Sequence, residues 1–511
     1  MLGRTQAVAL VGLAGHVVEV EAHVATGLPA FVLVGLPDAS LAESRDRVRA
    51  ALTNAGFSLP NRRVTVNLSP ASLPKTGSGF DLAIAVVLLA AAQRVDPLAA
   101  ARAVHVGELG LDGRLRPVRG VLPSVLAAVR AGRRRVVVPE GNAAEARLVP
   151  GVEVVSAVEL ADVVVAHGGD LEGVPRRRAE PVSHVVVDGP RGGAAPDLAD
   201  VVGQKDARSA LEVAAAGGHH LFLLGPPGAG KTMLASRLPG LLPDLTDEEA
   251  VEVTAIHSVA GTFDAASGLL RRPPFEDPHH TASPAAVVGG GSGLPRPGAA
   301  SRAHRGVLFL DEAPEFASSV LDALRQPLEQ GELVIARARG VARYPARFQL
   351  VMAANPCPCG QAVGKGTDCT CSALVRRRYL QRLSGPLMDR VDLQVEVLPV
   401  SHTAMTGTPG ESSADVAARV LTARRVQAER LAGTPWRCNS EVPGPVLRGR
   451  LRLPPGSTRL IDRCLDRGSV TARGYDRVLR VAWTLADLEG GTPHGDHVDR
   501  AWYLRTIGHA A

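Results

Sequence analysis

A glycine-rich loop near the middle of the chain constrains the fold more than any other feature. Residues 221–224 form a short apolar run, and residues 233–238 have the pattern of a helix. Between them lie Gly225, Pro226, Pro227, Gly228, Ala229, Gly230, Lys231 and Thr232. Glycines let backbone N–H groups approach a phosphate without a Cβ in the way, lysine adds a positive charge, and the threonine hydroxyl can ligate Mg²⁺. The sequence therefore predicts a strand, a phosphate-binding loop and a helix.

A second apolar run, residues 306–310, ends in two acids, Asp311 and Glu312. If this run is a parallel strand beside the loop strand, both acids lie at the edge of the sheet where the phosphates bind. Asp311 is then a candidate ligand for Mg²⁺, together with Thr232. Glu312 is the candidate base that deprotonates the attacking water.

A third apolar run, residues 348–354, ends in Asn355. At the end of a third parallel strand, its amide could hold the attacking water between the acids and the terminal phosphate. Asn before Pro356 is also a common turn residue. The third strand favours the catalytic interpretation.

Four of the six cysteines lie close together in the sequence, as Cys357, Cys359, Cys369 and Cys371. Four thiolates can close a tetrahedral zinc site. The single residue within each pair is a shorter gap than zinc sites usually have, so a reduced, metal-free loop is the alternative. We favour structural zinc that stabilises the loop next to Asn355.

A chain of 511 residues is too long for one hydrophobic core. Residues 172–199 are rich in proline and glycine, which predicts a linker with one short strand at 184–187. Strand-like and helical patterns alternate in residues 1–171 and again in 200–400, whereas residues 401–511 read as mostly helical. The expected class is α/β, with a helical domain at the end.

These motifs resemble the magnesium-chelatase-like AAA+ ATPases, and within them the ComM/YifB family. The matching segments are residues 202–204, 216–220, 256–261, 278–281, 289–291, 303–304, 324–328, 355–360 and 383–390. The resemblance implies a P-loop NTPase core with a parallel sheet flanked by helices, a C-terminal helical lid, and ATP and Mg²⁺ as cofactors.

The resemblance also implies a homo-hexameric ring with ATP bound between subunits. Arg390 then matches the finger that reaches the neighbour's γ-phosphate, with Arg382 as the second choice, and Arg473 matches the second sensor on the lid. Two inserts, residues 258–303 and a hairpin at 332–347, are expected to point into the pore. Arginines 337, 339 and 343 on that hairpin could grip phosphates, although a solvated hairpin face is the alternative. For His279 and His280 we expect structural use.

Residues 64–84 and 106–113 resemble the protease domain of Lon. Lon-type proteolysis needs a Ser nucleophile with a Lys base. Aligning Lys75 with the Lon pattern leaves Gly79 at the nucleophile position, one residue away from Ser78. Residues 1–171 are therefore expected to be a Lon-protease-like accessory domain that is proteolytically inactive.

Net charge is +6, which permits a polyanionic partner without requiring one. The longest apolar run, residues 82–92, is too short to span a bilayer, and the N-terminus lacks a signal-peptide pattern. We expect a cytoplasmic protein without a membrane partner. On resemblance, its function is that of a DNA translocase or branch-migration helicase in recombination of incoming DNA. The alternative is a chelatase-like ATPase subunit that drives metal insertion through protein partners.

Overall fold

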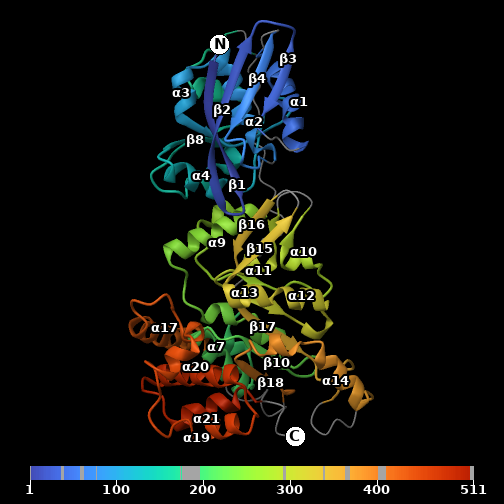
Figure 1. Cartoon of the computed structure of the whole chain (residues 1–511), viewed down its shortest axis with the longest axis vertical. Coiled ribbons are helices and arrows are strands. Elements are labelled where there is room, and N and C mark those ends of the chain that lie inside the picture. The colour runs from blue at the N-terminus through green and yellow to red at the C-terminus, as the bar shows by residue number, and fades with distance from the viewer. Residues whose placement is uncertain are drawn as a thin grey trace.

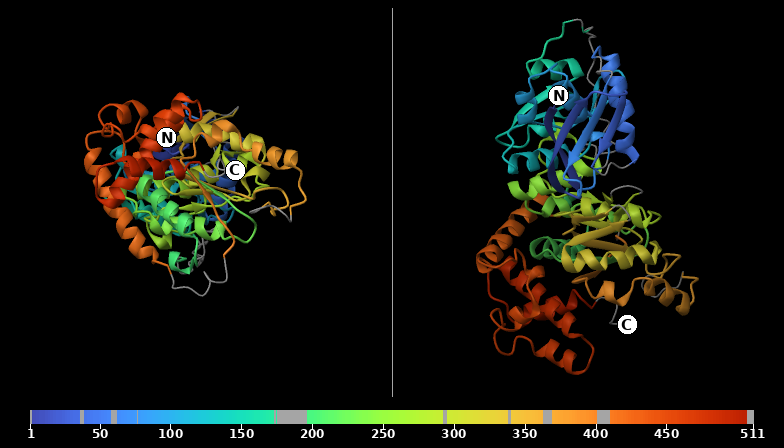
Figure 2. Two further views of the ribbon diagram at one scale, coloured as in Figure 1. Left: turned by 90° about the horizontal axis from the view of Figure 1, so that it is seen from below. Right: turned by 45° about the horizontal axis from the view of Figure 1, so that its top comes forward.

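The computed structural model describes residues 2–35, 39–57, 62–75, 77–172, 174, 196–291, 295–337, 340–362, 369–400 and 410–506, without the side chains of 39–42. The chain has three parts along its long axis (Figure 1). The N-terminal part lies at one end, a second sheet lies in the middle, and the C-terminal helices lie below and beside that sheet (Figure 2).

The N-terminal part is built on a seven-stranded mixed sheet in the order β3-β4-β2-β1-β5-β8-β9. The strands are β1 (Leu2–Val11), β2 (Ala14–Ala25), β3 (Ala30–Val34), β4 (Arg63–Ser69), β5 (Ala103–His105), β8 (Arg135–Pro139) and β9 (Glu153–Ala157), with β6 (Glu108–Leu109) and β7 (Leu115–Arg116) forming a small separate ribbon. β1 and β2 form a long antiparallel hairpin that places Val11 opposite Ala14.

Helices cover both faces of this sheet. Successive side chains of a strand point to opposite faces, and the strands carry apolar residues on both. Ala7 and Ala9 of β1 join the core under α2, whereas Val8 joins the core under α4. The helices are α1 (Ala39–Asn54), α2 (Asp81–Ala91), α3 (Pro97–Arg102), α4 (Val121–Arg130), α5 (Ala143–Ala146) and α6 (Leu160–Ala166). Every residue of α2 is buried, which explains why the sequence after Asp81 is entirely apolar.

The middle part contains a five-stranded parallel sheet in the order β11-β14-β17-β10-β18. Its strands are β10 (Leu221–Leu224), β11 (Phe275–Glu276), β14 (Val307–Leu310), β17 (Gln349–Ala354) and β18 (Leu393–Glu396). Both faces of the sheet are covered, so the three central strands β10, β14 and β17 read as nearly continuous apolar runs rather than alternating ones.

Short helices and two ribbons surround this sheet. The helices are α7 (Lys205–Gly217), α8 (Lys231–Ala235), α9 (Asp247–Ala260), α10 (Pro284–Val287), α11 (Ala299–Arg302), α12 (Ser318–Ala323), α13 (Arg325–Gln330), α14 (Ala373–Gln381) and α15 (Gly385–Met388). The ribbons pair β12 (Gly289–Gly290) with β13 (Arg296–Pro297), and β15 (Glu332–Arg337) with β16 (Gly340–Pro345).

The C-terminal part consists of helices: α17 (Ser413–Arg430), α18 (Gly444–Arg448), α19 (Arg459–Asp466), α20 (Ala472–Glu489) and α21 (Gly495–Tyr503). Residues of α17 and α20 share one hydrophobic core with α7 and with one face of the parallel sheet. A buried ion pair joins Arg477 of α20 to Asp392, which directly precedes β18.

The N-terminal part packs against the middle part at two places. The turn between β1 and β2 carries Leu13 into a small apolar cluster with Ile335 and Tyr344 of the β15–β16 hairpin. Nearby, the N–H of Gly120 donates to the carbonyl of Ser258 on α9 at 3.2 Å. Figure 1 shows this hairpin at the junction of the two parts.

The predicted fold class is confirmed, since a parallel sheet flanked by helices follows an α/β N-terminal part. Two local expectations were wrong. The helix after the phosphate loop ends at Ala235 and does not reach residue 238. Residues 258–303 are not a plain insert, because they supply β11, an edge strand of the sheet. Most of the expected linker, with its strand at 184–187, lies outside the described residues.

Candidate nucleotide site

Three neighbouring parallel strands end at the same edge of the middle sheet. β17 lies between β14 and β10, and the register pairs Leu310 with Met352 and Leu224 with Ala354. The residues that follow these strands therefore lie side by side, as the sequence analysis expected. They are the phosphate loop, the pair Asp311 and Glu312, and Asn355.

The loop after β10 has the backbone that a phosphate cradle requires. Gly228 and Gly230 adopt φ values of 75° and 93°, which glycine reaches without a steric penalty. A Cβ on Gly225 would lie 2.2 Å from the carbonyl oxygen of Val397. Lys231 then begins α8, so the helix N-terminus points at the loop.

The Lys231 side chain is folded into the loop and is only 8% exposed. Its Nζ donates to the carbonyl oxygens of Gly225 (2.7 Å) and Pro226 (2.9 Å) and to Oδ1 of Asn355 (3.0 Å). Burial lowers the pKa of Lys231, and the nearby Asp311 and Glu312 oppose that shift. A triphosphate would supply oxygens in place of these acceptors and would favour the charged amine.

Thr232 and Asp311 form the oxygen pair expected of a Mg²⁺ site. Thr232 Oγ1 donates to Asp311 Oδ2 at 2.6 Å. A hydroxyl and a carboxylate are ligands that suit Mg²⁺. These two residues fit the ion, which would neutralise charge on the phosphate oxygens.

Glu312 has an unusual backbone conformation. Its φ of 49° and ψ of 43° are left-handed, which non-glycine residues rarely adopt. Its N–H donates to Asp311 Oδ1 at 2.9 Å, and its carbonyl accepts from the N–H of Glu315 at 2.7 Å. The carboxylate lies 3.1 Å from Nδ1 of His280. Strain of this kind, which costs about 1–3 kcal/mol, concentrates at functional sites.

His280 is a residue for which sequence reasoning expected only structural use. It follows β11, the neighbour of β14. The register pairs Phe275 with Val307 and Glu276 with Leu308, and both His280 and Glu312 lie just beyond the ends of these two strands. The position of His280 could be recognised only from the pairing of β11 with β14, which was not predicted from the sequence.

The four clustered cysteines lie next to Asn355, and their sulfurs come together. Cys357 Sγ lies 3.3 Å from Cys359 Sγ and 3.6 Å from Cys369 Sγ, and the latter two are 3.7 Å apart. All four ligand atoms, including that of Cys371, lie within 4.8 Å of one another. A hydrogen bond from the Gln361 backbone lowers the pKa of Cys359 to about 6, whereas burial and the thiols of Cys357 and Cys359 raise the pKa of Cys369 to about 11.

The cysteine loop also contacts the phosphate loop. Gly360 has a φ of 77°, and a Cβ there would lie 2.5 Å from Cδ of Pro227. The segment that carries Asn355 and the cysteines is therefore closely packed against the residues that would hold phosphate.

The three arginines singled out in the sequence have other surroundings. Arg390 pairs with Glu329, Arg382 donates to Glu315 at 2.9 Å, and Arg473 is exposed at the start of α20. Within the described ranges, no hydrogen bond or ion pair joins any of them to Lys231 or Glu312.

The segment expected to form a hairpin consists of β15 and β16, with Arg337 opposite Gly340. Arg337 and Arg343 are exposed, and Arg343 also donates to Glu332 at 2.8 Å. Residue 339 lies outside the described residues. One face of the hairpin packs on the β1–β2 turn, so only part of it is free to meet a ligand.

In the N-terminal part, Lys75 and Ser78 have separate partners. The Lys75 ammonium is buried and donates to the carbonyls of Pro70 and, at 3.0 Å, Leu73. Ser78 donates to the carboxylate of Glu108. A Ser–Lys dyad requires the lysine amine to accept the serine proton, and here that amine points into backbone carbonyls.

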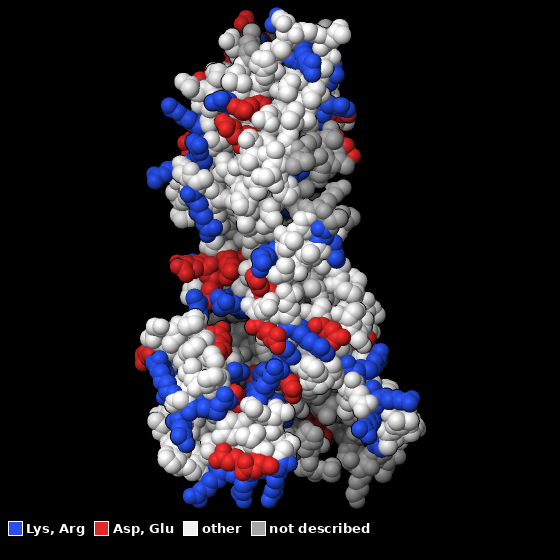
Figure 3. All heavy atoms as spheres, viewed as in Figure 1, with Lys and Arg blue, Asp and Glu red and all other residues white. Residues whose placement is uncertain are grey.

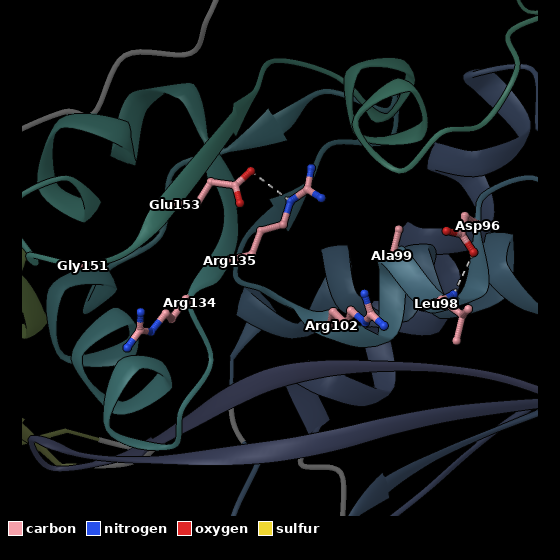
Figure 4. A pocket seen from close by; sticks show the side chains of 8 residues that line it. All are labelled: Asp96, Leu98, Ala99, Arg102, Arg134, Arg135, Gly151 and Glu153. Carbon is pink, nitrogen blue, oxygen red and sulfur yellow. Dashed lines mark hydrogen bonds and ion pairs between the residues drawn. The ribbon is translucent and has the colours of Figure 1, made fainter.

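A separate hollow of about 610 Å³ lies on the N-terminal part (Figure 4). Arg102, Arg134 and Arg135 line it but point in different directions, and Arg135 is paired with Glu153 at 3.4 Å. It shares no residue with the phosphate loop. Its arginines do not converge on one ligand position.

Three family models match the chain. "Magnesium chelatase, subunit ChlI" covers residues 197–405, "Subunit ChlI of Mg-chelatase" covers 20–142, and "Magnesium chelatase, subunit ChlI C-terminal" covers 410–505. The first includes every residue of the nucleotide site described above. Among the helices that the structure describes, none combines the length and apolar content needed to cross a membrane.

Close relatives cover nearly the whole chain. An uncharacterised protein of Mycobacterium tuberculosis is 53% identical over 508 residues, covering 99% of each chain. Competence protein ComM of Haemophilus influenzae is 44% identical over 484 residues, with 94% of this chain and 93% of that protein covered. YifB of Escherichia coli is 42% identical over 483 residues, covering 94% and 92%.

Proposed function

This chain belongs to the ComM/YifB family of magnesium-chelatase-like AAA+ ATPases, and from that premise we propose that it hydrolyses ATP to move DNA through a homo-hexameric ring. The observation that carries the ATPase is the meeting of Lys231, Asp311 and Asn355 at the end of three parallel strands. Such ends are where open α/β sheets bind their ligands.

Each side chain has a distinct role in the proposed reaction. Lys231 and the loop amides bind the phosphates, while Thr232 and Asp311 hold Mg²⁺. Glu312 takes a proton from the attacking water, and Asn355 holds that water against the terminal phosphate. Lys231 leaves Asn355 when phosphate oxygens arrive, which frees the amide for this role.

Arg390 acts from a neighbouring subunit in this proposal, where it would reach the neighbour's γ-phosphate. Arg473 would serve as the second sensor on the lid. Within the described ranges Arg390 bonds to Glu329 and Pro386 rather than to Lys231 or Glu312, which agrees with action between subunits. An arginine finger stabilises charge on the transferred phosphoryl group.

Several features support DNA as the substrate that is moved. The relative from H. influenzae is named a competence protein, which supports a role in recombination of incoming DNA. We propose that the chain acts there as a translocase or branch-migration helicase in the cytoplasm. Arg337 and Arg343 are exposed on the hairpin, and α14 exposes Arg377 and Arg378. On the face in Figure 3, positive and negative side chains are interspersed. Recognition would therefore use local arginine groups that contact phosphates without reading bases.

We further propose that the cysteine quartet holds a structural Zn²⁺. A tetrahedral site with Zn–S bonds of about 2.3 Å sets the sulfurs roughly 3.8 Å apart, and the three measured separations are 3.3, 3.6 and 3.7 Å. Bound metal would fix the loop that carries Asn355 against Pro227.

We also propose that residues 1–171 serve as a proteolytically inactive accessory domain. The separate partners of Lys75 and Ser78 support this role.

The test of DNA translocation is the ATPase rate with fork, Holliday-junction, single-stranded or no DNA. The proposal expects stimulation by DNA that weakens as salt rises, because phosphate contacts release counterions. Replacing Arg337 and Arg343 by Ala should reduce stimulation. Replacing the exposed Arg133 and Arg134 by Ala removes the same charge elsewhere and should not.

ATP hydrolysis that is indifferent to every DNA would contradict the translocase. It would favour the alternative that the magnesium-chelatase family models suggest, an ATPase subunit that drives metal insertion through protein partners.

A further inference from the structure

The two-residue turn between β1 and β2 lies against the β15–β16 hairpin, the segment to which the proposed function assigns DNA contacts (Figure 1). Leu13 in this turn packs against an apolar cluster on the hairpin. The cluster consists of Ile335, Ala342 and Tyr344, which are 6%, 0% and 2% exposed. Leu13 also packs against the core under α4. One side chain therefore joins the hairpin to the N-terminal part.

The backbones of the turn and the hairpin also approach each other closely. Gly12 adopts a φ of 65°, which glycine reaches without a steric penalty. A Cβ at this position would lie 2.6 Å from the carbonyl oxygen of Arg343 and 3.3 Å from its backbone nitrogen. The conformation of the turn and its contact with β16 both require glycine here.

The apolar contact decides which face of the hairpin is free. Ile335 lies opposite Ala342 in the register, and both side chains belong to the cluster that meets Leu13. Successive residues of a strand point to opposite faces. Arg343, the residue after Ala342, therefore points to the other face, and it is exposed there. Packing on Leu13 thus turns Arg343 outward.

Helix α9 supports the hairpin beside the turn. Val259 of α9 packs against the same cluster. The carbonyl of the preceding residue, Ser258, accepts from the N–H of Gly120 at 3.2 Å, and Ala255 belongs to the core under α4. The turn and α9 are thus both attached to the N-terminal part. A segment that is held in place before its ligand arrives loses less conformational entropy on binding.

We propose that the N-terminal part holds the β15–β16 hairpin in position for DNA, with Leu13 as the positioning residue. The inference rests on the proposed function, in which Arg337 and Arg343 contact phosphates. It gives the accessory domain a part in DNA binding. Neither cluster that contains Leu13 includes, among its described members, a residue of the phosphate loop. ATP hydrolysis without DNA should therefore not depend on Leu13.

The first test compares hydrogen exchange of the β15 and β16 amides in full-length Leu13→Ser and Leu13→Met. The serine variant should exchange at least about tenfold faster, because the buried apolar contact is lost and the hairpin opens more often. Methionine keeps an apolar side chain of similar size and should preserve protection. Leu28→Ala removes a leucine of the same part that is 88% exposed, and should change nothing.

The second test measures ATPase rate against the concentration of forked DNA. Leu13→Ser should raise the concentration for half-maximal stimulation about tenfold, because binding must then order the hairpin. The rate without DNA and KM for ATP should change less than about twofold. Leu13→Met and Leu28→Ala should match the wild-type protein. Val259→Ala weakens the same cluster from α9 and replaces Leu13→Ser if thermal unfolding shows that the serine variant is not folded.

Unchanged exchange of the hairpin in Leu13→Ser would overturn the inference. Unchanged dependence on DNA would overturn it as well, and so would tighter binding, which would mean that the contact restrains the hairpin. An equal loss of rate with and without DNA would show a general structural effect instead. Wild-type ATP hydrolysis that ignores DNA would refute the proposed function, and faster exchange in Leu13→Ser would then leave Leu13 only as a support of the hairpin.

Discussion

At the scale of single residues, Asn355 connects two parts of the site. Its amide oxygen accepts from Lys231 at 3.0 Å, and Cys357 follows it by two residues. The same side chain thus lies between the phosphate loop and the cysteine loop. Losing it removes the group proposed to hold the attacking water, while leaving the phosphate cradle intact.

Asn355→Ala should lower kcat for ATP about 100-fold, as removing one fixed polar group at a developing charge does. ATP affinity should fall little, because Lys231 and the loop amides still bind the phosphates. Steady-state kinetics together with ATP-binding titrations separate the two effects. Asn54→Ala, on the N-terminal part, is the matched control. A loss of affinity with unchanged kcat would show that Asn355 serves binding alone.

Motifs in the sequence predicted the loop, the acid pair and Asn355, because residue types at strand ends constrain chemistry strongly. The contact of His280 with Glu312 was not predicted, because it depends on β11, a strand of two residues with no clear pattern of its own. The ion pair between Arg390 and Glu329 could not be predicted from the sequence either, since it depends on how α13 lies against the segment after α15.

At the scale of elements, the cysteine loop should depend on metal. The purified protein should contain about one Zn²⁺ per chain by mass spectrometry of the metal. Cys359→Ser should lose it and should also reduce ATP turnover, because the loop against Pro227 loosens. Cys464→Ser removes a free thiol outside the cluster and should keep the metal. A protein that lacks zinc yet turns over ATP normally would contradict the proposed site.

A second element-scale prediction concerns the ion pair between Arg477 of α20 and Asp392, the residue before β18. Burial alone would raise the pKa of Asp392, but Arg477 and His219 outweigh burial and hold it well below its usual range. Asp392 is 1% and Arg477 15% exposed. Asp392→Asn leaves the arginine buried without its partner and should cost about 3–5 kcal/mol of unfolding free energy.

The pH dependence of stability has a defined sign. Because the folded pKa of Asp392 is depressed, its stabilisation is present above the unfolded value near 3.9 and is lost as pH falls toward the folded pKa. Denaturant unfolding at pH 7 and in the acid range checks both statements. Asp496→Asn, an exposed carboxylate, is the control. Equal stability of Asp392→Asn and Asp496→Asn at pH 7 would show that the ion pair between Asp392 and Arg477 does not stabilise the fold.

Elements themselves were largely predictable where the pattern was long. The strands β10, β14 and β17 match the apolar runs that predicted them, and the residues after 410 are helical as expected. Short elements were not, because tertiary contacts decide them. α8 stops at Ala235 before Pro239, which lacks the N–H of a continuing helix.

At the scale of the whole molecule, the proposed function needs a ring in which each site is completed by a neighbour. Arg390→Ala should therefore bind ATP normally and hydrolyse it at least about 1,000-fold more slowly, the range known for arginine fingers. Mixing it with Lys231→Ala subunits should restore some activity, since some interfaces then combine an intact loop with an intact finger. Absence of any rescue in mixed assemblies would argue against a shared site.

The central claim is that one set of side chains, at the ends of three neighbouring strands, binds and hydrolyses ATP. Its most direct test measures ATP binding and turnover in parallel for the wild-type protein, Lys231→Ala and Glu312→Gln. Lys231→Ala should lose binding, whereas Glu312→Gln should keep binding but turn over at least about 100-fold more slowly. Wild-type turnover in Glu312→Gln, or undiminished binding in Lys231→Ala, would contradict it.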